Sequence, residues 1–238
     1  MKNNKPASID KSKENVRAMF DNIAPNYDFL NHFLSMNTDK IWRRKVRKIA
    51  QKKNHNSILD LATGTGDLAI ELSKLKPKEL IGADISPQML EIAIKKVEKT
   101  KLNIKFVEAD ATNLPFEDNH FDIVTCAFGV RNFEDLSKGL SEINRVLKKG
   151  GTTIILEFSK IENKFFKSLF EFYFNNILPM LGKIFSKNHQ AYKYLPDSVN
   201  EFPYGISFGN KLKKNNFAIQ KIFKLSAGIA SIYIAQKI

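Results

Sequence analysis

Glycines and a carboxylate are spaced in the first half of the chain as a nucleoside-binding site requires. Gly64 and Gly66 interrupt the apolar run ILDLATGTGDLAIEL, and Asp84 ends a second apolar run twenty residues after Gly64. A glycine-rich turn between a strand and a helix lets a ligand approach bare backbone N–H groups. An acid at this spacing can accept hydrogen bonds from a ribose diol. The pattern therefore predicts a site for a nucleoside cofactor.

The residues around this turn help to separate dinucleotides from S-adenosylmethionine. Ala69 stands where a dinucleotide site has its third glycine, a replacement that such sites tolerate, so the turn alone does not exclude NAD. Asp60, just before the turn, would repel a pyrophosphate but suits a cofactor that carries an ammonium and a sulfonium. A third apolar run ends in Asp110-Ala111, where a carboxylate can accept from an adenine amino group and the next N–H can donate to the ring. These features favour S-adenosylmethionine.

Composition limits the partners that we expect. The 238 residues carry 38 Lys and Arg against 25 Asp and Glu, a net charge of +13, which favours nucleic acid or an anionic membrane surface unless it reflects a lysine-rich composition bias. Cys126 is the single cysteine, so no internal disulfide can form and a reducing cytoplasm is expected. The four histidines lack metal-ligand spacing, so no metal site is predicted.

Strand-like and helix-like runs alternate in the middle of the chain, which predicts a parallel sheet with a ligand at the carboxyl ends of its strands. We expect strands at 57–62, 79–84, 103–108, 121–127 and 152–158, with helices at 67–75, 87–99 and 134–147. FAIQKIFKL and IASIYIAQKI flank Ala227-Gly228 and predict a C-terminal antiparallel hairpin. The predicted fold is α/β: a Rossmann-like, seven-stranded sheet of five parallel strands plus the hairpin, typical of class I S-adenosylmethionine-dependent methyltransferases.

Further segments flank this sheet within one predicted domain, residues 13–238, which follows a disordered tail at 1–12. Residues 13–55 are expected to form an N-terminal helical cap. Its helix at 41–50 is expected to turn Ile41, Val46, Ile49 and Ala50 inward and Arg43, Arg44, Arg47 and Lys48 largely outward. Residues 160–205 are a helical insertion rich in aromatic residues between 165 and 174. This insertion is interpreted either as core or as a lid over an apolar acceptor.

Four motifs, in order, resemble the ubiquinone/menaquinone biosynthesis C-methyltransferases, and the similarity runs from about residue 14 to the end. They are YDFLNHFLSMNTDKIW (27–42), FGVRN (128–132), RVLKKGGTTIILEFS (145–159) and AYKYLPDSVNEFP (191–203). The sequence departs from the family pattern at Leu30, at Asp39, where the family commonly has His, and at Lys149, where it usually has Pro. The change at Asp39 argues against essential chemistry at that position, and the change at Lys149 should alter only a turn.

The resemblance implies a function and a set of cofactor contacts. It implies methylation of a ring carbon on a polyprenylated hydroquinone, in which S-adenosylmethionine is the methyl donor. Demethylmenaquinol is the favoured acceptor, and a ubiquinone precursor, 2-polyprenyl-6-methoxy-1,4-benzoquinol, is the alternative. The implied cofactor contacts are Thr65, Asp84, Asp110 and Ala111, beside Gly64 of the turn.

A ring carbon is a poor nucleophile until a neighbouring hydroxyl loses its proton, so the protein must hold the hydroquinone and stabilise a phenolate. Arg131 in FGVRN is always charged and is the candidate for that task, with Asn132 as a residue that orients the second ring oxygen. Tyr27 on the cap is expected to close the site. The alternative for Arg131 is a structural ion pair with Glu134 or Asp135. No side chain stands out as the general base.

Other functions remain to be weighed. Methyltransferases that act on base amino groups usually carry Asn/Asp-Pro-Pro-Tyr after the fourth strand, whereas AFGVRN has no proline, which argues against nucleic acid. A non-catalytic, cofactor-binding scaffold of a quinone-synthesis complex is a further alternative.

The start MKNNKPASIDKSKEN has no apolar core and the chain has no long apolar run, so a cytoplasmic protein with weak peripheral contact at the inner face of the membrane is expected. The sequence leaves open whether the protein forms a homodimer.

Overall fold

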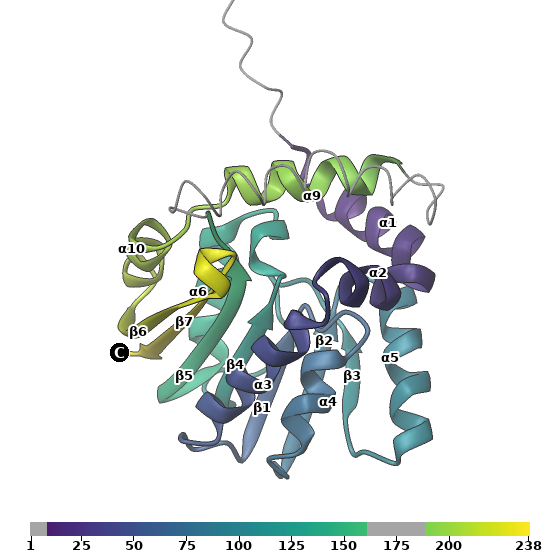
Figure 1. Ribbon diagram of the computed structural model, residues 1–238. Coiled ribbons are helices and arrows are strands. Elements are labelled where there is room, and N and C mark those ends of the chain that lie inside the picture. Colours follow the sequence, from purple (N-terminus) through teal and green to yellow (C-terminus); the bar gives the residue numbers. More distant parts are fainter. Residues whose placement is uncertain (1–8, 161–188) are drawn as a thin grey trace, which may run out of the picture.

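A seven-stranded sheet forms the centre of the protein, as a computed structural model that describes residues 9–160 and 189–238 shows (Figure 1). The strand order is β3-β2-β1-β4-β5-β7-β6, in which β1 to β5 run parallel and β7 lies antiparallel to both β5 and β6. The predicted parallel sheet with a C-terminal hairpin is therefore confirmed. The strands are β1 Ser57–Leu61, β2 Glu79–Asp84, β3 Lys105–Glu108, β4 Phe121–Ala127, β5 Leu147–Phe158, β6 Phe217–Leu225 and β7 Ala230–Lys237.

Helices cover both faces of the sheet because the central strands are apolar on both sides. All five residues of β1 are buried, which is the burial expected of a strand inside a parallel sheet. On one face, the strands pack against α3 (Thr38–Ala50) and α4 (Asp67–Ser73) through Val46, Leu68 and Leu72. On the other face, they pack against α6 (Leu136–Val146) and α10 (Ile206–Lys214) through Leu140, Ile143, Phe208 and Leu212. α5 (Pro87–Thr100) completes the described βα units.

Helices from the two ends of the chain meet over the carboxyl ends of the parallel strands. α1 (Lys13–Ile23), η1 (Ala24–Asn26) and α2 (Tyr27–Leu34) come from the predicted cap, and α9 (His189–Glu201) comes from the predicted insertion. Figure 1 shows α1 and α9 across the top of the sheet. The aromatic segment at 165–174 lies outside the described residues, so the lid interpretation of that segment stays a prediction. The tail prediction at 1–12 concerns mostly residues outside the described part as well.

The prediction for the basic helix was wrong at two positions of α3. Ile41, expected to face inward, is 61% exposed, and Arg43, expected to face outward, is only 9% exposed. Trp42 takes the inward place: it is buried, and its indole N–H donates to the Ser226 hydroxyl at 3.1 Å. Asp39, one turn before Arg43, supplies the carboxylate that makes burial of that guanidinium tolerable. α10 was not predicted from the sequence.

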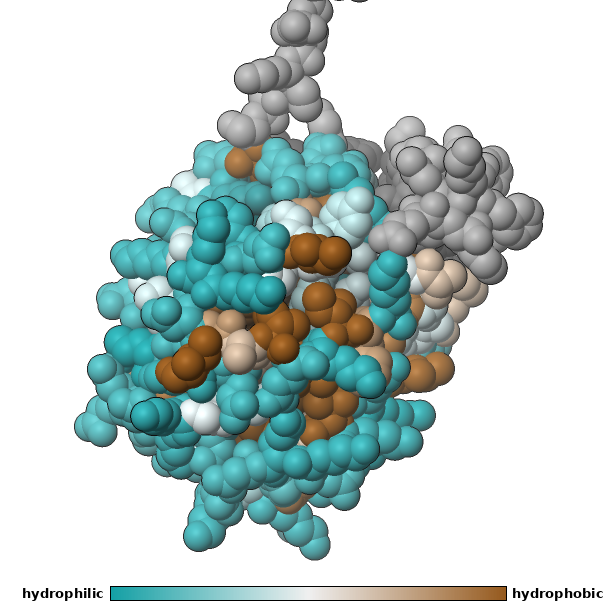
Figure 2. Space-filling model, turned by 90° about the vertical axis from the view of Figure 1, so that its left-hand side faces the viewer, coloured by the Kyte–Doolittle hydropathy of each residue, from teal (hydrophilic) through white to brown (hydrophobic). Residues whose placement is uncertain are grey.

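Polar and apolar regions share the face of the molecule that carries α10 and β6. Figure 2 shows a mostly hydrophilic surface with hydrophobic side chains gathered near the centre of this face. β6 is an edge strand, and it carries Lys221 and Lys224, which discourage pairing with a further strand. Across the described part of the chain, no helix combines the length and the apolar character needed to cross a bilayer.

Candidate active site

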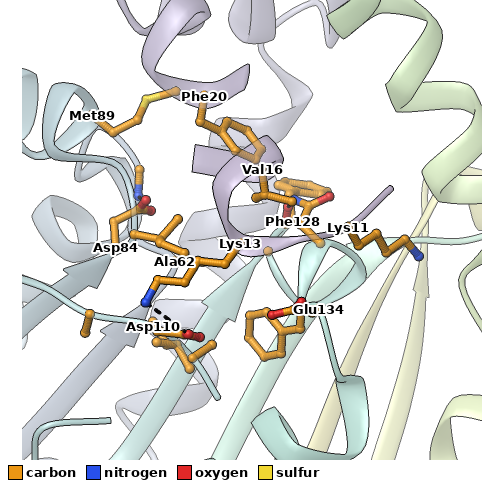
Figure 3. Close-up of a pocket in the computed structure, with 18 of the residues that line it drawn as sticks. Lys11, Lys13, Val16, Phe20, Ala62, Asp84, Met89, Asp110, Phe128 and Glu134 are labelled. Atoms are coloured by element: carbon orange, nitrogen blue, oxygen red, sulfur yellow. Dashed lines mark hydrogen bonds and ion pairs between the residues drawn. The ribbon is translucent and has the colours of Figure 1, made fainter. Parts of the chain in front are cut away.

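A pocket opens where β1, β2, β3 and β4 end, beneath α1 and the start of α2 (Figure 3). The chain turns sharply there because Gly64 and Gly66 adopt φ values of +57° and +83°, which glycine tolerates best. Residues predicted from distant parts of the sequence come together in the lining of this pocket. Those residues are Tyr27, Gly64, Asp84, Asp110, Ala111 and Asn132.

Asp84 holds the glycine turn in place. One of its carboxylate oxygens accepts the Gly64 N–H at 2.7 Å, and the other accepts the Ser86 N–H at 2.9 Å. Burial raises the pKa of Asp84 above its ordinary value, although these backbone N–H groups oppose the shift. The carboxylate therefore lies in the lining with part of its accepting capacity already used by the protein.

Asp110 presents the second carboxylate of the pocket. It accepts the Thr112 N–H at 2.8 Å and the Thr112 hydroxyl at 2.9 Å, and the Lys13 ammonium lies 3.5 Å away (Figure 3). Burial alone would raise the pKa of Asp110, but Thr112 and Lys13 outweigh it and lower that pKa. A cation from α1 thus lies against the carboxylate that was predicted to accept from an adenine amino group.

This donor and acceptor set fits the cofactor class predicted from the sequence. Asp84 and Asp110 are two acceptors at neighbouring strand ends, as a ribose diol and an adenine amino group require. Apolar side chains of Val16, Phe20 and Met89 lie between α1 and the strand ends and offer surface for a flat ring (Figure 3). The pocket is suited to a nucleoside that donates hydrogen bonds from both ends.

Thr65 and Asp60, by contrast, direct their side chains into the protein and are not among the described lining residues. The Thr65 hydroxyl donates to Asp28 of α2, which ties the glycine turn to the cap. Asp60 accepts the hydroxyls of Thr63 and Thr125, each at 2.7 Å, beneath the turn. Desolvation raises the pKa of the buried Asp60 to about 6, although the threonine bonds oppose it.

Arg131 forms a buried ion pair beside the pocket. Its guanidinium lies 2.8 Å from Glu157 of β5, donates to the Phe128 carbonyl oxygen and is 7% exposed. The alternative drawn from the sequence therefore named the wrong partners: Asp135 instead caps α6 by accepting the Lys138 N–H at 3.0 Å, and Glu134 lines the pocket. Arg131 is not among the described lining residues, although the next residue, Asn132, is.

Sequence reasoning missed Glu157, although a signal was present. An acid in the otherwise apolar run IILEF must find a partner when the strand is buried. The Glu157 side chain is fully buried, and desolvation raises its pKa while the charge of Arg131 opposes that shift.

Two tyrosines approach this side of the pocket. Tyr27 lies edge-on to Phe20 with a centroid separation of 6.2 Å, and burial raises its pKa while the charge of Arg131 opposes the shift. Tyr194 of α9 donates its hydroxyl to the Asn132 carboxamide oxygen at 3.1 Å. Tyr194, like Glu157, was not singled out from the sequence.

Histidine spacing gave no sign of a cluster that the fold creates outside the pocket. Ligand atoms of His32, Asp39 and Asp67 lie within 4.8 Å of one another. Both carboxylates already face cations of the protein: Arg43 pairs with Asp39, and Lys96 lies 2.8 Å from Asp67. These contacts make the cluster a set of ion pairs that joins α2, α3 and α4.

Comparison with known proteins places these features in a family. Residues 8–237 match the model of the ubiE/COQ5 methyltransferase family. A demethylmenaquinone methyltransferase of Bacteroides fragilis is 46% identical over 237 residues, which cover 98% of this chain and 97% of that protein. The ubiquinone/menaquinone biosynthesis C-methyltransferase UbiE of Geotalea uraniireducens is 43% identical over 233 residues, with 96% and 99% covered.

A solved structure supports the fold independently. A S-adenosylmethionine-dependent methyltransferase of Thermotoga maritima, described as a possible histamine N-methyltransferase, superposes with a TM-score of 0.64. It is 21% identical, and the match covers 94% of this chain and 100% of that one. At this identity the likeness concerns the fold alone.

Proposed function

The chain belongs to the ubiE/COQ5 methyltransferase family, and we propose that it transfers the methyl group of S-adenosylmethionine to a ring carbon of demethylmenaquinol in menaquinone biosynthesis. The similarity to a demethylmenaquinone methyltransferase over 98% of this chain supports the proposal. The single observation in the structure that carries it is the pocket that joins two acceptor carboxylates to η2 (Val130–Asn132), which we call the VRN turn. That catalysis needs no metal stays a prediction.

In this proposal, the strand ends bind the cofactor. S-adenosylmethionine supplies an electrophilic methyl group on a sulfonium. Asp84 accepts from the ribose, Asp110 accepts from the adenine amino group in place of Lys13, and the Ala111 N–H donates to the adenine ring. Gly64 keeps the turn free of a side chain, and Thr65 contributes by fixing the turn to Asp28.

We propose that the acceptor lies on the side of the pocket next to Arg131. The charge of Arg131 opposes the burial shift in the pKa of Tyr27, so its field reaches a hydroxyl in the pocket lining. The same field favours a phenolate over a phenol on a bound hydroquinone. We propose that Arg131 stabilises the developing phenolate in this way while Glu157 holds the guanidinium in place, and that Tyr27 closes the pocket over the ring.

A direct transfer assay tests the function. Purified protein is incubated with S-adenosylmethionine and a short-tailed, reduced demethylmenaquinol, and the product is identified by mass spectrometry. We expect one methyl group on the ring. A ubiquinone precursor is the second acceptor to test, because the Geotalea relative is named for both quinones. Cofactor binding without transfer to either acceptor would favour the scaffold alternative.

We further propose weak peripheral contact with anionic membranes, because a polyprenyl tail resides in the bilayer. The structure changes which residues supply that contact: Arg43 is buried and Arg47 pairs with Glu71 at 2.7 Å. The exposed cations of α3 that remain are Lys40, Arg44 and Lys48, which share one helical face at four-residue spacing. Each contributes on the order of 1 kcal/mol near an anionic leaflet, and salt screens the attraction.

Co-sedimentation with vesicles tests this contact. Replacing Lys40, Arg44 and Lys48 together by Gln should reduce binding to anionic vesicles at low salt and leave methylation of a short-tailed acceptor unchanged. Lys95, Lys99 and Lys101, which are exposed on or just after α5, provide a control with the same loss of charge. Equal loss of binding in both variants, or salt-independent binding to neutral vesicles, would contradict a role for this face of α3.

A further inference from the structure

α9 contacts the VRN turn at the point where the turn enters the pocket. The Asn132 side chain lines the pocket and is 8% exposed, and its carboxamide oxygen accepts the Tyr194 hydroxyl at 3.1 Å. One helical turn further along α9, the Ser198 hydroxyl lies 3.4 Å from the Arg131 side-chain Nε. Two residues on one face of α9 therefore contact two consecutive residues of the turn.

A carboxamide has an accepting end and a donating end, and rotation by 180° exchanges them. The Tyr194 hydroxyl donates to the oxygen of Asn132 on the α9 side, and the nitrogen faces the Phe128 carbonyl oxygen, which can only accept; the two contacts together fix the orientation of the carboxamide. That nitrogen lies 3.5 Å from the Phe128 carbonyl oxygen, a long contact that leaves donating capacity on the amide. A phenolate or ring oxygen is an acceptor, so it needs the N–H end of the amide rather than the oxygen end.

We propose that Tyr194 is a positioning residue for the acceptor: its hydroxyl fixes the Asn132 carboxamide so that an amide N–H faces the ring oxygen of the hydroquinone. This inference rests on the proposed function, because it assigns the oxygen-bearing acceptor to the Asn132 side of the pocket.

The ionisation of Tyr194 is consistent with this role. Desolvation is the main cause that raises its pKa to about 12, and the nearby charge of Arg131 opposes the shift. The phenol therefore keeps its proton at neutral pH and remains a donor. A phenylalanine at this position would keep the ring and its packing but could no longer determine which end of the amide faces the pocket.

A double-mutant cycle tests the proposal. Tyr194→Phe should raise the KM for a short-tailed demethylmenaquinol about three- to tenfold, the range expected for one hydrogen bond, with a smaller change in kcat. Binding of S-adenosylhomocysteine, measured by calorimetry, should not change. In an Asn132→Ala background, Tyr194→Phe should have no further effect on KM, because the group on which it acts is gone.

Tyr233→Phe serves as the matched control. It removes a tyrosyl hydroxyl that accepts the Gly205 N–H at 2.7 Å, on β7 and outside the pocket lining. It should lower the melting temperature without changing the KM for the acceptor. An unchanged KM in Tyr194→Phe, a full additional loss in the Asn132→Ala background, or an effect that only parallels melting temperature as in the control would each overturn the proposal. Absence of methyl transfer by the wild-type protein would instead reject the proposed function.

Discussion

The cofactor side and the acceptor side of the pocket are built by different means. On the cofactor side, each carboxylate accepts from the residue two places further along the chain, Asp110 from Thr112 and Asp84 from Ser86. Asp84 also accepts from Gly64, twenty residues earlier, in the turn that follows the neighbouring strand. On the acceptor side, the bonded partners are far apart in sequence: 26 residues separate Arg131 from Glu157, and 62 separate Asn132 from Tyr194. Cofactor recognition thus depends on local turns at strand ends, whereas acceptor recognition depends on how α9 and β5 pack.

The largest expected effect lies on the acceptor side. Arg131→Ala should lower turnover by about 100-fold or more, the magnitude typical for loss of a group that stabilises developing negative charge. Affinity for S-adenosylmethionine should stay within about twofold, because Arg131 is not among the described lining residues. Arg131→Lys should restore little, since a lysine cannot reproduce the planar contacts with Glu157 and Phe128.

A second variant separates chemistry from folding. Arg131→Ala leaves Glu157 buried without its cation, so the protein should also be less stable. In the double variant Arg131→Ala/Glu157→Gln that uncompensated charge is removed, and stability should recover while turnover does not. Recovery of both would mean that Arg131 serves only as the partner of Glu157.

The next effect concerns Asp60, below the cofactor side. Its pKa is raised from 3.8 to about 6, so the folded state binds a proton more tightly than the unfolded state does. Protonated Asp60 therefore adds at most about 3 kcal/mol to the free energy of unfolding. This contribution is fully present below pH 3.8 and is lost as the pH rises from 3.8 through about 6. As the pH rises through that range, Asp60→Asn should become more stable relative to the wild type, because the asparagine does not titrate; urea unfolding measures the difference. A constant difference between the two proteins would show that Asp60 titrates normally.

The two sides of the pocket also differ in how far the sequence predicted them. The fold and the carboxylates at strand ends were predictable, because residues such as Gly64 and Asp84 lie next to strands that can be recognised in the sequence as apolar runs. Glu157 and Tyr194 were not, because their partners are determined only when β5 and α9 pack against the VRN turn. Arg43 was predicted outward for the same reason: helical spacing showed one face of α3 but not the pairing with Asp39.

A smaller effect is expected at Asp84. Asp84→Ala should lower affinity for S-adenosylmethionine at least tenfold in calorimetry, because it removes charge-assisted bonds to the ribose, each on the order of 1.5–3 kcal/mol. It also removes the acceptor of the Gly64 N–H, so the glycine turn loses a hydrogen bond that stabilises it. Asp84→Asn, which keeps one oxygen for that N–H, should fold like the wild type and still bind the cofactor poorly. Unchanged affinity in both variants would remove Asp84 from the cofactor site.

The smallest expected effect tests whether the cap competes with the cofactor. Lys13 lies 3.5 Å from Asp110 with 45% of its side chain exposed, and an exposed pair of this kind contributes only about 0.2–1 kcal/mol. If the adenine amino group takes the place of Lys13, Lys13→Ala should raise cofactor affinity by about two- to threefold at low salt, and the gain should vanish at high salt. Lys95→Ala, which removes a pair with Glu91 on α5 away from the described pocket lining, is the control and should leave affinity unchanged. A loss of affinity in Lys13→Ala alone would mean that the ammonium contacts the cofactor directly, and that the cap, like the acceptor side, builds its part of the pocket through distant contacts.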